Sequence, residues 1–142
     1  MEKLKSWTNN LVNSLEKQLD KEVSVKLIES CGRICANECG ATKKVDEILK
    51  SLVDTASIDT IIEKMNKELC GGNLRKEGNT IILIYEHCYC PHRKHIESDL
   101  YCMCTQGWAK EVFEKALGEK VNVVLEKSLA WGDEVCKIVV TY

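Results

Sequence analysis

The sequence predicts an α+β fold: N-terminal helices packed on a small antiparallel sheet, with a long C-terminal helix and a terminal β-hairpin. Three observations predict it. Apolar residues recur at helical spacing through most of the first 70 residues, a short β-branched run follows a Cys-Gly-Gly break, and two alternating segments come last. A chain of 142 residues suits one domain over 1–142, with a helical half 1–70 and a strand, cysteine loop, helix and hairpin half 71–142.

Four helices are expected in the first half. The first extends from Leu4 to Leu19, and the third and fourth begin after Thr42 and Ser57, residue types that cap helix N-termini. The second helix stops at Gly40, because glycine readily ends a helix. Its apolar stripe, which predicts that the helix carries cysteines on its buried side, consists of Leu27, Ile28, Cys31, Ile34 and Cys35.

The second half begins with the sequence TIILIYE, residues 80–86, which is too short and too β-branched for a helix. This segment predicts a buried strand that pairs with 73–76 through a turn. Helical spacing returns over 98–117 and ends at Gly118. Alternating apolar residues then predict a hairpin over 121–142.

Composition and charge give no support to several classes of protein. A net charge of -2 and a pI near 6.0 give no basic footprint for nucleic acid or for an anionic membrane surface. No segment approaches the roughly 18 apolar residues of a membrane span, and the N-terminal sequence lacks a signal peptide pattern. We therefore expect a cytoplasmic protein with reduced thiols, and the odd count of nine cysteines excludes complete pairing within the chain.

The segment 86–108 holds two Cys-x-Cys pairs and all three histidines. Cys88 and Cys90 come where the strand runs into Pro91, and neighbouring thiols in an irregular turn can bend toward one centre. A polar loop offers little hydrophobic core, so metal ligation explains these two thiols better than packing does.

The other cysteines are weighed by their position on helices and strands. Cys102 and Cys104 differ by about 200° around a helix, so one site cannot take both. Cys102 is the better ligand, since it lies nearer the core direction and a helix N-terminus stabilises a thiolate. Cys31 and Cys35 are balanced between ligation and core packing, which also favours cysteine. The weaker candidates are Cys39, Cys70, Cys104 and Cys136.

The predicted metal ligands are therefore Cys31, Cys35, Cys88, Cys90 and Cys102. Thiolate-rich tetrahedral sites suit zinc or, as the alternative, an iron–sulfur cluster. The chain has no Cys-x-x-Cys, so the common zinc-ribbon spacing and a thioredoxin-like pair are both absent.

A catalytic hypothesis competes with the metal hypothesis. A cysteine could be activated by His87, His92 or His95, or a histidine could act with Asp133 in hydrolysis. Histidines beside basic residues are usually just solvated, and the sequence HRKH fits that description. No catalytic residue is assigned, and a small metal- or cysteine-dependent hydrolase remains the alternative function.

The last 60 residues resemble a known family. The similarity rests on Cys102, Gly107, Leu117-Gly118, Val121, Val123, Glu126, Gly132-Asp133 and Cys136. In these positions the chain resembles the 4-vinyl reductase domain, a small-molecule-binding module related to the haem-nitric-oxide-binding fold. It is also similar to amino-thiazoline-carboxylate hydrolase-like, cysteine-rich families. The resemblance implies an α+β fold that encloses a ligand pocket, with cysteines able to bind metal, although Ser128 stands where the pattern usually has a cysteine.

A ligand pocket is expected between the long helix, the sheet and the helix that carries Cys31 and Cys35. Gly107 costs about 1 kcal/mol relative to alanine inside a helix, so it indicates the close approach of another backbone or of a bound group. The expected ligand-binding residues are Trp108, Val112 and Phe113. The leading hypothesis is a metal-binding sensor or accessory protein with an unidentified small ligand. A purely structural or interaction domain comes third, and a homodimer is left open.

Overall fold

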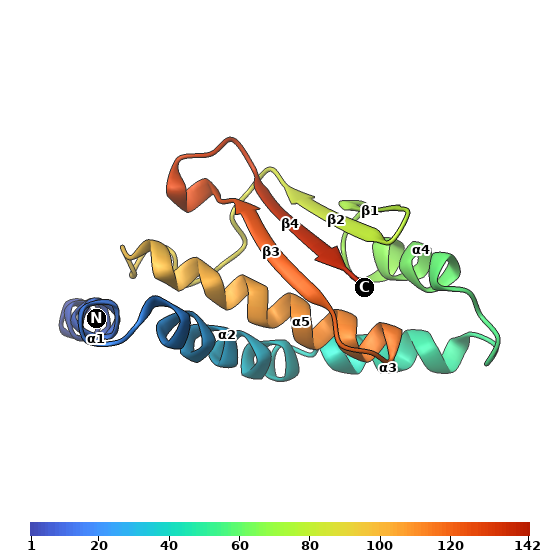
Figure 1. Cartoon of the computed structure of the whole chain (residues 1–142), viewed down its shortest axis with the longest axis horizontal. Coiled ribbons are helices and arrows are strands. Elements are labelled where there is room, and N and C mark those ends of the chain that lie inside the picture. Colours follow the sequence, from blue (N-terminus) through green and yellow to red (C-terminus); the bar gives the residue numbers. More distant parts are fainter.

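Five helices and a four-stranded antiparallel sheet make up the structure, a computed structural model that describes residues 1–142 (Figure 1). Of two 3-10 turns, η1 directly precedes α5 and η2 lies in the connection between β3 and β4. The elements in chain order are α1 (Glu2–Gln18), α2 (Lys21–Glu38), α3 (Ala41–Ser51), α4 (Ile58–Glu68), β1 (Leu74–Glu77), β2 (Thr80–Tyr85), η1 (Asp99–Cys102), α5 (Met103–Leu117), β3 (Asn122–Lys127), η2 (Leu129–Trp131) and β4 (Cys136–Thr141). The predicted α+β class is confirmed.

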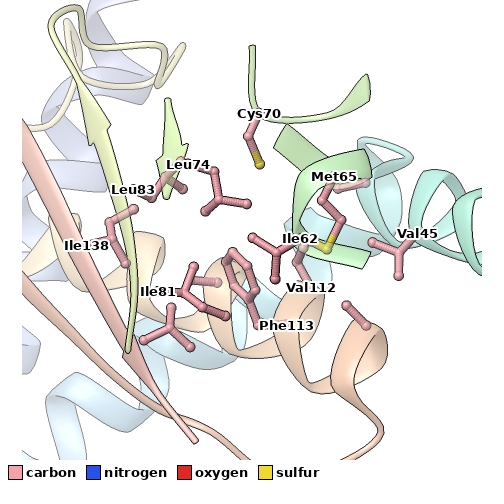
Figure 2. Close-up of a cluster of buried hydrophobic side chains, with 14 of the residues drawn as sticks. Val45, Ile62, Met65, Cys70, Leu74, Ile81, Leu83, Val112, Phe113 and Ile138 are labelled. Carbon is pink, nitrogen blue, oxygen red and sulfur yellow. The ribbon is translucent and has the colours of Figure 1, made fainter. Parts of the chain in front are cut away.

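The sheet has the strand order β1-β2-β4-β3, so the terminal strand β4 lies between β2 and β3. Helix α5 lies along one face of this sheet, and α2 packs on the opposite side of α5 (Figure 1). Phe113 and Val112 of α5 are fully buried with Ile81 of β2 and Met65 of α4 in the main core. Figure 2 shows Phe113 at the centre of this cluster, between the sheet and α4.

The predicted helix ends and turns are mostly confirmed. Ser57 caps α4 by accepting a hydrogen bond from the Thr60 N–H at 3.2 Å, and Gly118 ends α5 at φ 71°. One expected cap is wrong. Helix α3 begins after Gly40, at φ 86°, and Thr42 lies inside its first turn.

The buried side of α2 is not the predicted one. Leu27 and Ile34 are 45% and 58% exposed, and Cys31 and Cys35 are exposed as well. The side that faces α5 instead consists of Ser24, Ile28, Glu29, Gly32 and Ala36.

Two glycines explain this orientation. A Cβ on Gly107 would lie 2.7 Å from the Cα of Glu29, and a Cβ on Gly32 would lie 2.8 Å from the backbone nitrogen of Trp108. Real Cβ atoms essentially never come that close, so the two helices cross backbone to backbone only because both positions lack a side chain. The close approach of another backbone that Gly107 predicted is confirmed.

Polar contacts fix the same crossing. The Glu29 carboxylate accepts hydrogen bonds from Gln106 Nε2 at 2.9 Å and from Lys110 Nζ at 2.6 Å. Gln106 Oε1 in turn accepts from the N–H of Leu125 on β3 at 2.9 Å. These hydrogen bonds fix the position of α5 relative to both α2 and the edge strand β3, and so position the side chains at the start of α5. None of the helices combines the length and the apolar composition needed to cross a membrane.

Candidate functional site

Most of the cysteines come from segments that meet at one end of the sheet, where β2 ends, β4 begins and α5 begins (Figure 1, left). Tyr85, the last residue of β2, pairs with Cys136, the first residue of β4. The loop that carries Cys88 and Cys90 leaves from that point. It is tied back to η2 by Arg93, which donates to the Leu129 carbonyl at 3.0 Å.

Cys102 and Cys136 lie side by side at the end of β3. Ser128 Oγ donates to Cys102 Sγ, and the N–H of the next residue, Leu129, donates to Cys136 Sγ, both at 3.4 Å. Burial raises the pKa of Cys102, the Ser128 hydrogen bond opposes that change, and the nearby thiols of Cys136, Cys88 and Cys90 raise the pKa further. These thiols are therefore close enough to repel one another when they are ionised.

Cys104 lies on the other side of α5, toward α2. Its backbone contacts α2 at Gly32, between Cys31 and Cys35 in the sequence. Burial, followed by the thiols of Cys35, Cys90, Cys31 and Cys102, raises the pKa of Cys104 to about 12. Cys104 thus belongs to the same electrostatic environment as the α2 cysteines.

Cys90 lies against the residue that precedes Cys102. Its Sγ is 3.1 Å from the Tyr101 hydroxyl, just before Cys102 in the chain. Burial and this hydrogen bond raise the pKa of Tyr101, and the pKa of Cys35 is raised by burial and then by Cys39 and Cys90. We use the name thiol cluster for Cys31, Cys35, Cys88, Cys90, Cys102, Cys104 and Cys136.

The thiol cluster contains all five predicted metal ligands and two cysteines that sequence reasoning ranked lower, Cys104 and Cys136. Cys104 was set aside because it faces away from Cys102, and the structure shows that it faces α2 instead. Cys136 was expected to be structural because it alternates with Ile138 and Val140, which are indeed buried. The signal that could have found Cys136 was its place in the Gly-Asp-x-x-Cys turn.

The thiols are not arranged as the ligands of one metal ion in this structure. No three histidine, cysteine, aspartate or glutamate side chains lie together as one metal ion would require, and all nine cysteines are free. A change of χ1 rotamer moves a cysteine sulfur by about 3 Å. Cys88 and Cys90 also lie in a loop without regular secondary structure, where the backbone has room to adjust.

The two remaining cysteines lie outside the thiol cluster. Cys70 is 2% exposed in the main core, and burial raises its pKa to about 12 (Figure 2). Cys39 is exposed near the end of α2, where its thiol donates to the Ala36 carbonyl at 3.7 Å.

The residues of the catalytic hypothesis do not meet. His87, His92 and His95 are all exposed, and none of them hydrogen-bonds to a cysteine or to Asp133 through its imidazole. The Asp133 carboxylate accepts from the Ser128 N–H at 2.9 Å, which gives it a role in the turn. The ring of His92 meets Tyr101 edge to face, with centroids 6.3 Å apart.

The expected ligand-binding residues belong to α5. Val112 and Phe113 are fully buried in the core, and Trp108 is partly exposed beside it. Two surface hollows lie elsewhere, one on α4 and one between α2 and α5 beside Lys26 and Lys110. A ligand-binding role for the three α5 residues stays a prediction.

Comparison with known proteins gives a family and a fold. The model of a family of unknown function (DUF6144) matches residues 1–142. No curated protein matches the chain. Among solved structures, it is similar to a trafficking protein particle complex subunit 3 from Naegleria fowleri, which is covalently bound to palmitic acid in that crystal structure. The TM-score is 0.56 at 17% identity, over 99% of this chain and 93% of that chain, so this likeness shows the fold alone.

Proposed function

This chain belongs to the family of unknown function DUF6144, and we propose that it is a cysteine-ligated metal-binding protein that acts as a sensor or accessory module. One observation carries the proposal: thiols from the loop after β2, the start of α5 and β4 meet at one end of the sheet, where Cys90 contacts Tyr101 and where Ser128 and Leu129 donate to Cys102 and Cys136. The metal is zinc or an iron–sulfur cluster, because both prefer thiolate ligands. A small ligand beside the metal and a cytoplasmic location remain part of this hypothesis.

Core packing does not account for these thiols. Cys70 shows what a packed cysteine looks like in this fold, at 2% exposure and surrounded by apolar side chains. Cys31 and Cys35 are exposed, and the other five members of the thiol cluster are half-buried. Thiols at such positions are accessible to a metal ion, whereas a buried structural cysteine is inert.

The charges around the thiol cluster also support a cation. Burial, which disfavours a charged thiolate, raises the pKa of Cys102 and Cys104 most, and repulsion from neighbouring thiols raises it further. Arg33 does not offset this repulsion, since it is bound by Glu111 at 2.9 Å and by Glu114 at 2.6 Å, so Arg93, which donates to the Leu129 carbonyl, is the arginine that places a positive charge beside these thiols. A bound metal ion would deprotonate the coordinating thiols, and its positive charge would offset the repulsion between the thiolates that result.

The experiment is elemental analysis and a visible spectrum of the full chain purified without oxygen. Zinc gives a colourless protein and an iron–sulfur cluster gives a brown one. Serine in place of Cys102 or Cys104 should lower metal content and stability together, because binding free energy is also folding free energy. The matched control is Cys70→Ala, a cysteine of the main core whose raised pKa has no contribution from another thiol, and this variant should retain full metal. A wild-type protein without metal, after incubation with zinc and after cluster reconstitution, would refute the proposal.

A second candidate function is assembly, and it is favoured by the exposed apolar residues of α1 and α2. Leu4, Trp7 and Ile34 are 63%, 62% and 58% exposed, although such residues normally lie inside. The fold neighbour is named as a subunit of a complex. The partner that we propose is a second copy of this chain. Light scattering after gel filtration should give a dimer, and Trp7→Ser with Ile34→Ser should give a monomer. A monomeric wild type would exclude the homodimer.

A further inference from the structure

We infer that Cys35 and Cys39, at the end of α2, form a binding site for trivalent arsenic, as arsenite or an organoarsenical, with both thiols as its ligands. This inference does not rest on the proposed metal-binding function. The observation that carries that proposal lies at the end of the sheet, on thiols of the loop after β2, the start of α5 and β4, and that site can be filled without Cys35.

The two thiols lie one helical turn apart on the surface of α2. The Cys39 N–H donates to the Cys35 carbonyl at 2.8 Å, so the helical hydrogen-bond pattern reaches Cys39 although it is the C-cap. The contact of the Cys39 thiol with the Ala36 carbonyl, at 3.7 Å, shows that its sulfur leans back along the helix toward Cys35. Both cysteines are exposed, and a Cβ on the neighbouring Gly40 would meet nothing within 4 Å. The pair is therefore open to a ligand from solution.

The spacing of the two side chains suits a bridging atom better than a disulfide. Residues four apart on a helix have Cβ atoms about 5–6 Å apart, whereas a disulfide requires about 3.5–4.5 Å. A disulfide between Cys35 and Cys39 would therefore distort the last turn of α2. An atom bonded to both sulfurs spans the longer distance and leaves the helix intact.

The charges around the pair favour a ligand that leaves it neutral. Burial raises the pKa of Cys35 most, and Cys39 and Glu38 raise it further, so thiolates are disfavoured here. The last turn of α2 has no basic residue, and Arg33 is already paired with two glutamates. A copper(I) ion on two thiolates would leave a net negative charge at a helix C-terminus, where negative charge is destabilising.

Zinc on two thiolates would be neutral, but it takes four ligands in a structural site. No third histidine, cysteine, aspartate or glutamate side chain lies with Cys35 and Cys39 to complete such a site. Trivalent arsenic needs only the two thiolates, because a hydroxyl or a carbon atom supplies its third bond. The resulting group carries no charge.

The binding step is a ligand exchange in which nothing is oxidised or reduced. A hydrated arsenical, R–As(OH)₂, loses two As–O bonds and gains two As–S bonds, and each thiol proton leaves with a hydroxide as water. The helix holds the second thiol beside the first, so the second As–S bond forms within one molecule at a high effective concentration. A single thiol lacks this advantage.

The test uses phenylarsine oxide, added in one equivalent to the full chain in the presence of excess glutathione, which removes arsenic held by one thiol only. Mass spectrometry should show one phenylarsenic group per wild-type chain. Trypsin cuts after Arg33 and Lys43, so the peptide 34–43 contains Cys35 and Cys39 as its only thiols. This peptide should carry the arsenic.

Cys39→Ser should retain the arsenical at least about 100-fold more weakly against glutathione, because only one thiol of the pair remains. Cys31→Ser is the matched control, since it also removes an exposed thiol one turn from Cys35, and it should retain the arsenical as the wild type does. Circular dichroism should show the same helix content in both variants. Equal retention in the two variants overturns the inference. So does arsenic on another peptide, a bridge between 27–33 and 34–43, or a wild-type chain that holds no arsenic in glutathione.

Discussion

The glycine crossing between α2 and α5 gives the sharpest test of how this fold is built. Alanine at Gly107 would place its Cβ 2.7 Å from the Cα of Glu29, where ordinary contact begins at 3.4 Å, and would overlap the Glu29 carbonyl more severely. The neighbouring atoms are backbone on a packed helix, so they cannot turn away as a flexible side chain would. The two helices must therefore separate.

The expected cost follows from three contributions. Alanine gains about 1 kcal/mol over glycine in a helix interior. Overpacking costs about 1–3 kcal/mol, and often more when backbone has to move. Separation of the helices also weakens the hydrogen bonds from Gln106 and Lys110 to the Glu29 carboxylate, each of the charged kind that contributes about 1.5–3 kcal/mol. We expect a net loss of about 2–4 kcal/mol of unfolding free energy.

Urea unfolding followed by circular dichroism measures this loss for Gly107→Ala, and Gly32→Ala should behave in the same way. Gly40→Ala is the matched control. Nothing lies within 4 Å of its Cβ, so it should lose only the roughly 1–2 kcal/mol that a left-handed backbone costs an L-residue. If Gly107→Ala is as stable as the wild type, or more stable, helix propensity alone governs the position and the crossing described here is wrong.

Three further outcomes are expected. Burial raises the pKa of Cys70 to about 12, whereas the same thiol ionises near pH 8.5 in the unfolded chain, so the contribution of Cys70 to stability should be constant below that pH and fall above it. Iodoacetamide at pH 9 should accordingly modify Cys39 long before Cys70. Equal modification rates for the two thiols would contradict the burial of Cys70. Glu29→Ala should cost about 1.5–3 kcal/mol of stability, because it removes two hydrogen bonds to a carboxylate, while Lys26→Ala on the exposed face of α2 should change stability by less than about 0.5 kcal/mol. Metal should leave between pH 8 and pH 5, since protons compete for the thiolates, and metal content unchanged by acid would contradict thiolate ligation.

The secondary structure was largely predictable because it depends on local sequence patterns. Ser57 and Gly118 end helices through their own backbone and side-chain chemistry, and the alternation around Ile138 predicts a strand regardless of its partners. The face that α2 buries was not predictable from hydrophobic periodicity. Periodicity assumes that the apolar stripe is the buried one, but Gly32 and Gly107 allow a backbone contact that turns Leu27 outward.

The residues of the candidate site also differ in whether local sequence or tertiary contacts identify them. Cys88 and Cys90 were identified from a local feature, a loop that ends a strand and offers no core. Cys104 and Cys136 could be found only through tertiary contacts, since one depends on the helix crossing and the other on the pairing of β4 with β2. The sequence shows which residues lie one turn apart on the same helix. It does not show which residues come into contact through strand pairing or through the crossing of two helices.

The α2–α5 crossing and the thiol cluster depend on the same helix contact. Gly32 stands between Cys31 and Cys35, and the backbone that it admits is that of Cys104, so the same contact that packs α2 on α5 determines how near three thiols come. An ion bound by those thiols would hold the two helices together from one flank, while the Glu29 hydrogen bonds hold them nearer the middle. Metal binding must then stabilise the crossing by as much as the crossing strengthens metal binding, because linkage between two events in one molecule is reciprocal. In such a sensor, metal binding to the thiol cluster would change the α2–α5 contact. Because α2 carries exposed apolar residues, this change would also shift the surface that is available to a partner.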